Sequence, residues 1–286
     1  MGWTRWLRVS DRLEYAEGLD RVVGPVQKIV QKVPPGAVKD ALHGVWLGHP
    51  LHPVLVQVPV GAWMSAAFLD VSPDGERQAR HLIGIGLLAS VPAALAGSAD
   101  WAEQHEQQMR VGVVHAAANS TAITLYLGSL LARSRQRTGL GKVLGFAGLA
   151  AVAAGGLLGG DISYRQAGGA NHAEEVPHLV EPGWHDLLRL DALEDGKPVH
   201  ELLGEVPVLA VRDGGQVHVL ADKCAHMSGP LSDGQITDGC VTCPWHGSVF
   251  RLADGTVARG PATANQPVFS TRVRDGMVQV CLPGAG

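Results

Sequence analysis

Two short stretches decide how the C-terminal part of this chain folds: CAH at residues 224–226 and CPWHG at residues 243–247, with 16 residues (227–242) between them. Each stretch supplies one thiol and one imidazole, both of which bind metals. A zinc site of two cysteines and two histidines is one interpretation, but zinc-finger spacing places both cysteines in one loop and both histidines in another. One cysteine and one histidine in each loop suits a two-iron cluster, in which one iron takes two thiolates and the other takes two imidazoles.

The pattern C-x-H followed by C-x-x-H resembles the Rieske-type [2Fe–2S] proteins, and the resemblance covers the C-terminal third of the chain. It implies that Cys224 and Cys243 bind the buried iron. It also implies that His226 and His246 bind the outer iron with their free nitrogens near the surface. Ser248 matches a serine whose hydroxyl donates a hydrogen bond to a cluster sulfur. The resemblance therefore predicts a [2Fe–2S] cofactor in an all-β domain.

Residues beside the motif predict a low or intermediate reduction potential. High-potential members of the family have an extra disulfide, but here Trp245 stands at one of the two cysteine positions and no cysteine follows the first motif. Phe250 replaces a tyrosine whose hydroxyl donates to a ligand sulfur. Hydrogen-bond donors stabilise the charge of the added electron, so losing one lowers the potential. The class spans roughly −150 to +300 mV.

The other two cysteines, Cys240 and Cys281, have no paired motif. Cys240 lies three residues before Cys243, which on spacing alone suggests a metal-binding pair. Because Cys243 already has a role, we interpret Cys240 as an ordinary strand residue. Unpaired thiols favour a reducing compartment.

Short alternating runs surround the motif and predict a small all-β domain over residues 183–283. Turn signals separate these runs, and a linker rich in Gly, His and Glu (residues 166–182) precedes the domain. The predicted strands are residues 206–212, 216–221, 239–243, 248–252 and 277–282.

The composition indicates that part of the chain does not meet water. Hydrophobic residues make up 46% and charged residues only 17%, against about 25% charged in typical soluble proteins. The net charge of −4 argues against broad nucleic-acid binding.

About 20 helical residues span a bilayer core, so the sequence predicts an integral membrane protein with a four-helix transmembrane bundle (residues 45–165). The four predicted spans are residues 51–71, 81–99, 111–132 and 140–160.

The N-terminal segment, residues 1–44, carries seven Lys and Arg residues and apolar residues at helical spacing. A basic amphipathic helix on the surface of the lipid bilayer is one interpretation. A helix packed on the bundle is the other. Paired glycines on the fourth predicted span let helices approach closely; packing within the chain and a homodimer contact are the alternatives.

A second resemblance covers about residues 40–170. LGHPLHP at residues 47–53, GGDISY at residues 159–164, Asp100 with Trp101, and His115 resemble an uncharacterised family of four-span bacterial membrane domains. The family has no assigned chemistry, so the resemblance implies none.

Polar residues gather at one end of the predicted spans, because an even number of spans puts both termini and the loop between spans two and three on one side. Ionisable residues at membrane depth are costly and indicate function. Several interpretations of these residues are open. They could bind haem or a divalent metal, form hydrogen bonds to quinone, or cap helix ends. The candidate residues are His49, His52, Asp100, His115, Asn119 and Asp161.

The two halves together predict a membrane-anchored protein that carries single electrons between a redox partner protein and another donor or acceptor, quinone being one candidate. A redox-sensing or scaffold protein and a quinone-linked reductase are the alternatives. We expect an electron-transfer component and not a self-contained enzyme, because about 40 residues follow the second motif and no nicotinamide or flavin motif occurs. Loop charges put both termini outside, whereas cluster insertion favours the cytoplasmic side, which we prefer.

Overall fold

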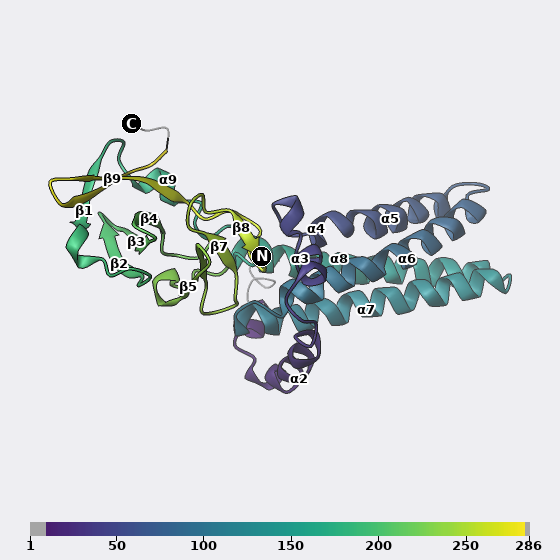
Figure 1. Ribbon diagram of the computed structural model, residues 1–286. Helices are drawn as coiled ribbons and strands as arrows, with labels where there is room; N and C mark the ends of the chain where they lie inside the picture. The colour runs from purple at the N-terminus through teal and green to yellow at the C-terminus, as the bar shows by residue number, and fades with distance from the viewer. Residues whose placement is uncertain (1–9, 284–286) are drawn as a thin grey trace. The chain divides into compact units, whose positions relative to one another are not determined.

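The computed structural model describes residues 10–283, which fall into two compact units (Figure 1). The helical unit comprises residues 10–34 and 51–168 of this range, and the β unit comprises residues 35–50 and 169–283. The predicted linker therefore joins the β unit from residue 169 onward, and part of the N-terminal segment does so too. Each unit is described separately below.

Four long helices of the described helical unit pack side by side, α5 against α6, α6 against α7, α7 against α8, and α8 against α5. A short helix, α4, leads into α5, and a π-helical turn, η3, follows α8. The elements are η1 (Glu17–Leu19), α2 (Asp20–Val30), α4 (His52–Leu55), α5 (Gln57–Val71), α6 (Glu76–Trp101), α7 (Glu106–Ser134), α8 (Thr138–Gly160) and η3 (Asp161–Arg165).

Among the described residues, three helical stretches are long and apolar enough to cross a membrane: His52–Val71, Glu76–Trp101 and Thr138–Arg165. Helix α7 is long enough but less apolar. Although residues 111–132 contain no Asp, Glu, Lys or Arg, polar side chains such as His115 and Asn119 lower its hydropathy. A fourth span in α7 therefore stays a prediction.

The centre of the helical unit is built from aromatic rings set against glycines. Trp63 stacks on Tyr126 with ring centroids 4.2 Å apart and planes 11° from parallel. A Cβ at Gly86 would lie 2.2 Å from Trp63 Nε1, and a Cβ at Gly148 would lie 2.9 Å from the Tyr126 ring. Small residues thus let α6 and α8 approach the stacked pair.

A buried ion pair joins two helices at the far end from α4. Arg133 of α7 donates to Asp70 of α5 through Nη1 to Oδ1 at 2.8 Å, and the two side chains are 1% and 3% exposed. Lys142 Nζ of α8 donates to the Asp70 carbonyl at 2.7 Å. A Cβ at Gly141, one of the paired glycines of the fourth predicted span, would lie 2.5 Å from Arg133 Cγ, so this glycine packs within the chain.

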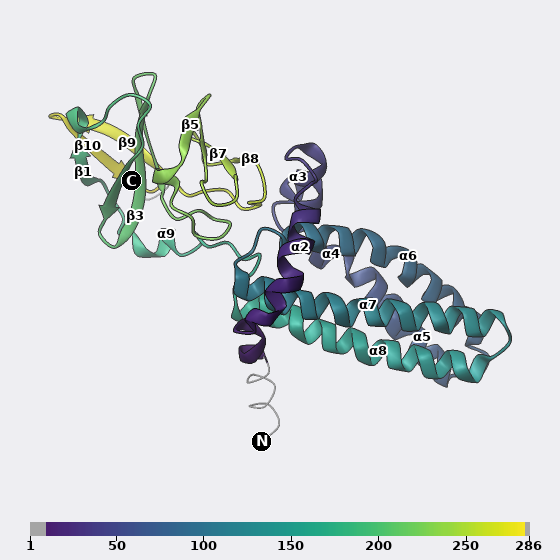
Figure 2. The ribbon, with the colours of Figure 1, turned by 90° about the horizontal axis from the view of Figure 1, so that it is seen from below.

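Helix α2 buries Val23 but leaves several other apolar side chains exposed. Gln27 Nε2 donates to the Ala102 carbonyl at 2.9 Å. Val22, Val26 and Ile29 are 46%, 40% and 63% exposed. Figure 2 shows α2 running across the first part of α7. The helix thus packs on the bundle while it presents an apolar face that suits a bilayer surface.

The strands between residues 10 and 283 form a six-stranded antiparallel sheet, in the order β1-β10-β9-β4-β3-β2, and a four-stranded antiparallel sheet, β5-β6-β7-β8. All five predicted strands are present, with ends that differ by at most one residue; β1, β2, β5, β8 and β9 were not predicted. The strands are β1 (His185–Arg189), β2 (Val199–Leu203), β3 (Val206–Asp213), β4 (Gln216–Ala221), β5 (Gln235–Thr237), β6 (Cys240–Thr242), β7 (Val249–Arg251), β8 (Val257–Arg259), β9 (Val268–Arg274) and β10 (Met277–Cys281).

Short helical elements complete the β unit. Ala173 and Val176, in the stretch predicted as a linker, are 0% and 3% exposed and belong to its two buried cores. Residues 169–182 therefore help to fold the β unit. The elements are α3 (Ala37–His43), η2 (Val45–Leu47), α9 (Val176–Leu179), η4 (Leu190–Ala192) and η5 (Leu231–Asp233).

Candidate iron–sulfur site

The two motif stretches form two loops that each close on themselves. The first loop follows β4, and the second connects β6 to β7. In the first, Cys224 N donates to the Gly229 carbonyl at 2.9 Å; in the second, Cys243 N donates to the Ser248 carbonyl at 2.8 Å. Gly247 has φ +73°, a conformation that glycine adopts without strain. Backbone hydrogen bonds thus fix both cysteines at the starts of tight loops.

The two cysteine thiols meet in the interior of the β unit. Cys224 and Cys243 are 1% and 3% exposed. The hydrogen bond from Cys224 lowers the pKa of Cys243 to about 7. The same hydrogen bond, together with burial, raises the pKa of Cys224. A Cβ at Gly229 would lie 2.9 Å from Cys243 Sγ and 3.0 Å from the Trp245 ring, so only glycine fits where the loops face each other.

The two histidines form a second pair nearer to the surface. His226 and His246 are half-buried, with ring centroids 5.1 Å apart and planes at 84°. Two thiols in one pair and two imidazoles in another match the donor set of a two-iron cluster with unlike irons.

Residues outside the motif hold the loops in place. Gln266, which is 2% exposed, accepts from Ala225 N at 2.9 Å and donates to the carbonyls of Ala221 and Lys223 at 2.8 Å each. Sequence reasoning missed Gln266, because it lies in an irregular stretch far along the chain from the loop it supports. A local pattern gives no signal of such a contact.

His172 and Ser248 also make hydrogen bonds that hold the two loops. His172 N donates to the Ala225 carbonyl at 2.9 Å, and His172 Nδ1 lies 3.1 Å from the Ser228 hydroxyl. Ser248, which is 0% exposed, accepts from Ala262 N at 3.0 Å. Because a hydroxyl both accepts and donates, this bond leaves the proton of Ser248 for a further acceptor.

Comparison with known families divides the chain into a membrane part and a Rieske part, as the sequence pattern does. Residues 183–270 match the family described as Rieske [2Fe-2S] domain. Residues 48–172 match the family described as predicted membrane protein (DUF2231). The chain belongs to the Rieske [2Fe–2S] family. Its Rieske domain implies a [2Fe–2S] cluster, and the donor set described above fits that group.

Similar proteins include ferredoxin components of oxygenases. The chain is 32% identical over 97 residues to the anthranilate 1,2-dioxygenase ferredoxin subunit of Burkholderia cepacia, covering 34% of this chain and 90% of that one. It is 33% identical over 78 residues to ferredoxin CarAc of Metapseudomonas resinovorans (27% and 73%). It is 35% identical over 88 residues to human apoptosis-inducing factor 3, of which it spans 14%. A solved complex of oxygenase and ferredoxin in carbazole 1,9a-dioxygenase is 28% identical with a TM-score of 0.33, over 34% of this chain and 92% of that one.

Part of the predicted membrane-face site comes together. His52 Nδ1 donates to the Ala93 carbonyl, and His115 Nδ1 donates to the Gly155 carbonyl, each at 2.8 Å. The two rings lie 6.3 Å apart at 80°. Asn119 Nδ2 donates to the His115 carbonyl at 3.0 Å and lies 3.1 Å from His115 Nε2. These contacts gather three of the six predicted residues.

The other three predicted residues have different surroundings. Asp161 accepts from the Ser10 hydroxyl and pairs with Arg165 at 3.0 Å. Asp100 lies at the end of α6, where its carbonyl accepts from Glu103 N. His49 is exposed and belongs to the β unit. Among residues 10–283 no group of three or more His, Cys, Asp or Glu residues is arranged for a metal ion.

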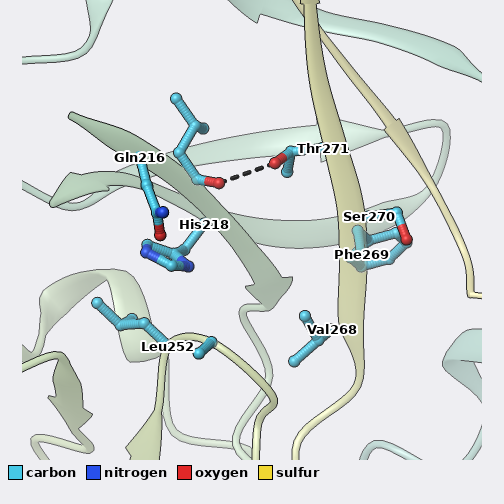
Figure 3. Close-up of a pocket in the computed structure, with 9 residues that line it drawn as sticks. Gln216, His218, Leu252, Val268, Phe269, Ser270 and Thr271 are labelled. Carbon is cyan, nitrogen blue, oxygen red and sulfur yellow. Dashed lines mark hydrogen bonds between the residues drawn. The ribbon is translucent and has the colours of Figure 1, made fainter. Parts of the chain in front are cut away.

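A shallow pocket of about 340 Å³ lies elsewhere on the Rieske domain. Figure 3 shows residues of β4 and β9 around it, with the Thr271 hydroxyl donating to the Val217 carbonyl at 2.8 Å. None of the four predicted cluster ligands lines this pocket. Its lining residues are Gln216, Val217, His218, Leu252, Ala253, Val268, Phe269, Ser270 and Thr271.

Proposed function

We propose that this protein is a membrane-anchored Rieske electron carrier. Cys224 and Cys243 would hold one iron, and His226 and His246 the other. The observation that supports this best is the separate pairing of buried thiols and half-exposed imidazoles. The [2Fe–2S] group, when bound, supplies reversible one-electron chemistry.

The chain's own residues would shield and tune that group. Burial of the two thiols excludes water from the sulfur side, whereas the imidazole edges give a partner protein its shortest approach. The Ser248 proton would donate to a cluster sulfur and stabilise the reduced state. Phe250 offers no second hydroxyl, so we expect a low or intermediate potential.

A redox protein is the proposed partner. Two of the similar proteins are named as ferredoxins or ferredoxin subunits, one of them of a dioxygenase, and such a carrier passes electrons without transforming a substrate itself. We therefore propose an electron-transfer component of an oxidoreductase system, with an oxygenase or a reductase as its partner class.

We also propose that α7 crosses the bilayer as a fourth span. Arg110 and Arg133 bracket an uncharged stretch, and their separation of 23 residues corresponds to about 35 Å of helix, enough for a hydrocarbon core of about 30 Å. Both termini then lie on one side. We prefer the cytoplasmic side, where clusters are normally inserted, with α2 lying in the headgroup layer of the lipid.

Spectroscopy of the detergent-purified protein tests the main proposal. We expect about two irons per chain, the EPR signal of a Rieske cluster, and a midpoint potential below about +200 mV. Reduced protein should also reoxidise rapidly with its partner, which a redox sensor or a scaffold need not do. Iron-free, colourless protein after anaerobic purification would contradict the proposal, and a potential above that value would contradict the account of Ser248 and Phe250.

A quinone-linked reductase is the second candidate function. The observation that favours it is the pair of His52 and His115, whose Nδ1 atoms both donate to carbonyls. In each ring Nε2 is then the acceptor nitrogen. That of His115 faces Asn119 Nδ2 at 3.1 Å, so His52 Nε2 is the atom that suits a quinol hydroxyl. We expect added quinone to oxidise the reduced cluster in the wild type and not in His115→Ala. Equal oxidation rates in the two proteins would remove this candidate.

A further inference from the structure

A segment that precedes the first membrane helix in sequence packs with the Rieske domain. This pre-membrane segment, residues 37–47, comprises α3 and η2 and belongs to the β unit. Asp40 Oδ1 accepts a hydrogen bond from Gly260 N at 3.0 Å, across 220 positions of the chain. Hydrogen bonds from a backbone N–H to a carboxylate are among the stronger ones in proteins. The contact therefore ties the pre-membrane segment to a specific loop of the domain.

The fit around Gly260 leaves no room for a side chain. A Cβ at this position would lie 2.9 Å from Val45 Cγ2, 3.3 Å from Asp40 Oδ1 and 3.6 Å from His43 Cδ2. Gly260 is buried, and His43 is 1% exposed. Three residues of the pre-membrane segment thus close on one glycine. Protein interiors are packed tightly. A shift of the pre-membrane segment would therefore move the loop that holds Gly260, and a shift of this loop would move the segment.

The loop held by Asp40 continues directly to the cluster site. Gly260, Pro261 and Ala262 are consecutive and buried. Ala262 N donates to the Ser248 hydroxyl at 3.0 Å. Ala262 also lies in the same buried core as Cys224 and Cys243. Only Pro261 therefore separates the residue that contacts Asp40 from the residue that orients Ser248.

We propose that Asp40 is a positioning residue for the iron–sulfur cluster. Its carboxylate fixes the loop 260–262, and Ala262 N in turn occupies a lone pair of the Ser248 hydroxyl, so that the Ser248 proton is directed to the cluster sulfur. The pre-membrane segment thereby sets the reduction potential of the Rieske domain. This inference rests on the proposed function, because it needs a bound cluster with Ser248 as a donor.

Comparison of Asp40→Ala with Asp40→Asn in the full-length protein tests the inference. Both variants lack the negative charge, but asparagine keeps an oxygen that can accept from Gly260 N, so their difference reports the hydrogen bond alone. We expect a lower midpoint potential and displaced EPR g values in Asp40→Ala, with Asp40→Asn keeping the g values of the wild type. Identical potentials and g values in the two variants would overturn the inference.

A second pair of variants keeps the test decisive if Asp40→Ala does not fold. Gly260→Ala should displace the loop and lower the potential, because its methyl group would collide with Val45 Cγ2. Adding Val45→Ala removes that atom and should restore the potential and the g values. Failure of the added Val45→Ala to restore them, or a wild-type potential in Gly260→Ala alone, would refute the inference. A wild-type protein without any Rieske signal would instead refute the proposed function.

Discussion

Replacement of Cys243 with serine is expected to abolish cluster binding, with iron content falling from about two per chain to near zero. Cys243 is one of only two thiols at the site, it is 3% exposed, and it faces Cys224. A serine hydroxyl at neutral pH does not supply the thiolate that iron–sulfur clusters require. Iron analysis, visible absorption and EPR of the purified variant measure the loss directly. Cys224→Ser should behave in the same way.

The chain supplies matched controls for this experiment. Cys240 lies three residues before Cys243, on β6, and Cys281 lies on β10 with its thiol donating to the Leu282 carbonyl at 3.2 Å. Serine at either position removes a thiol without touching the proposed ligands, so both controls should keep their iron and their spectra. Loss of the cluster in Cys240→Ser, or its retention in Cys243→Ser, would contradict the ligand assignment.

Local spacing was enough to predict the [2Fe–2S] cofactor of the Rieske domain. It did not predict the distant residues that hold the two motif loops in place. The motif residues lie within two short loops, so their pairing follows from sequence pattern alone. Gln266 reaches Ala225 across 41 positions, and Asp40 reaches Gly260 across 220. No periodicity or motif encodes contacts at such separations. They arise when β strands and the pre-membrane segment fold together, and only the structure reveals them.

The helical unit shows a similar division. Apolar length predicted four spans, and three of the helices among the described residues are long and apolar enough to cross a membrane, because bilayer thickness acts on each helix separately. The helix faces that pack together are determined by individual glycines and polar groups. Gly86, for example, leaves space for the Trp63 ring. The predicted span 51–71 contains Asp70 near its end, but its partner, Arg133, lies 63 positions away. Of the six polar residues predicted at one end of the spans, His52, His115 and Asn119 come together and the other three have different neighbours.

The partner of Asp70 leads to the second large effect, a loss of stability in Arg133→Met. Methionine fills part of the space of arginine but leaves the Asp70 carboxylate buried without its cation. Breaking a buried ion pair by removing one partner costs about 3–5 kcal/mol, and the two side chains here are 1% and 3% exposed. We expect the free energy of unfolding in detergent to fall by that amount, measured by the fluorescence of Trp63 and the other tryptophans.

Two comparisons separate the ion pair from a general effect of losing an arginine. Arg135 lies two residues further on and is exposed. In Arg135→Met the free energy of unfolding should fall by no more than about 0.5 kcal/mol, as it does for most surface substitutions. The double variant Asp70→Leu with Arg133→Met removes both charges, and well-packed apolar replacements of a buried pair are often neutral or stabilising. It should therefore recover most of the lost stability. A double variant as unstable as Arg133→Met would show that the cost comes from packing around Gly141 and not from the uncompensated carboxylate.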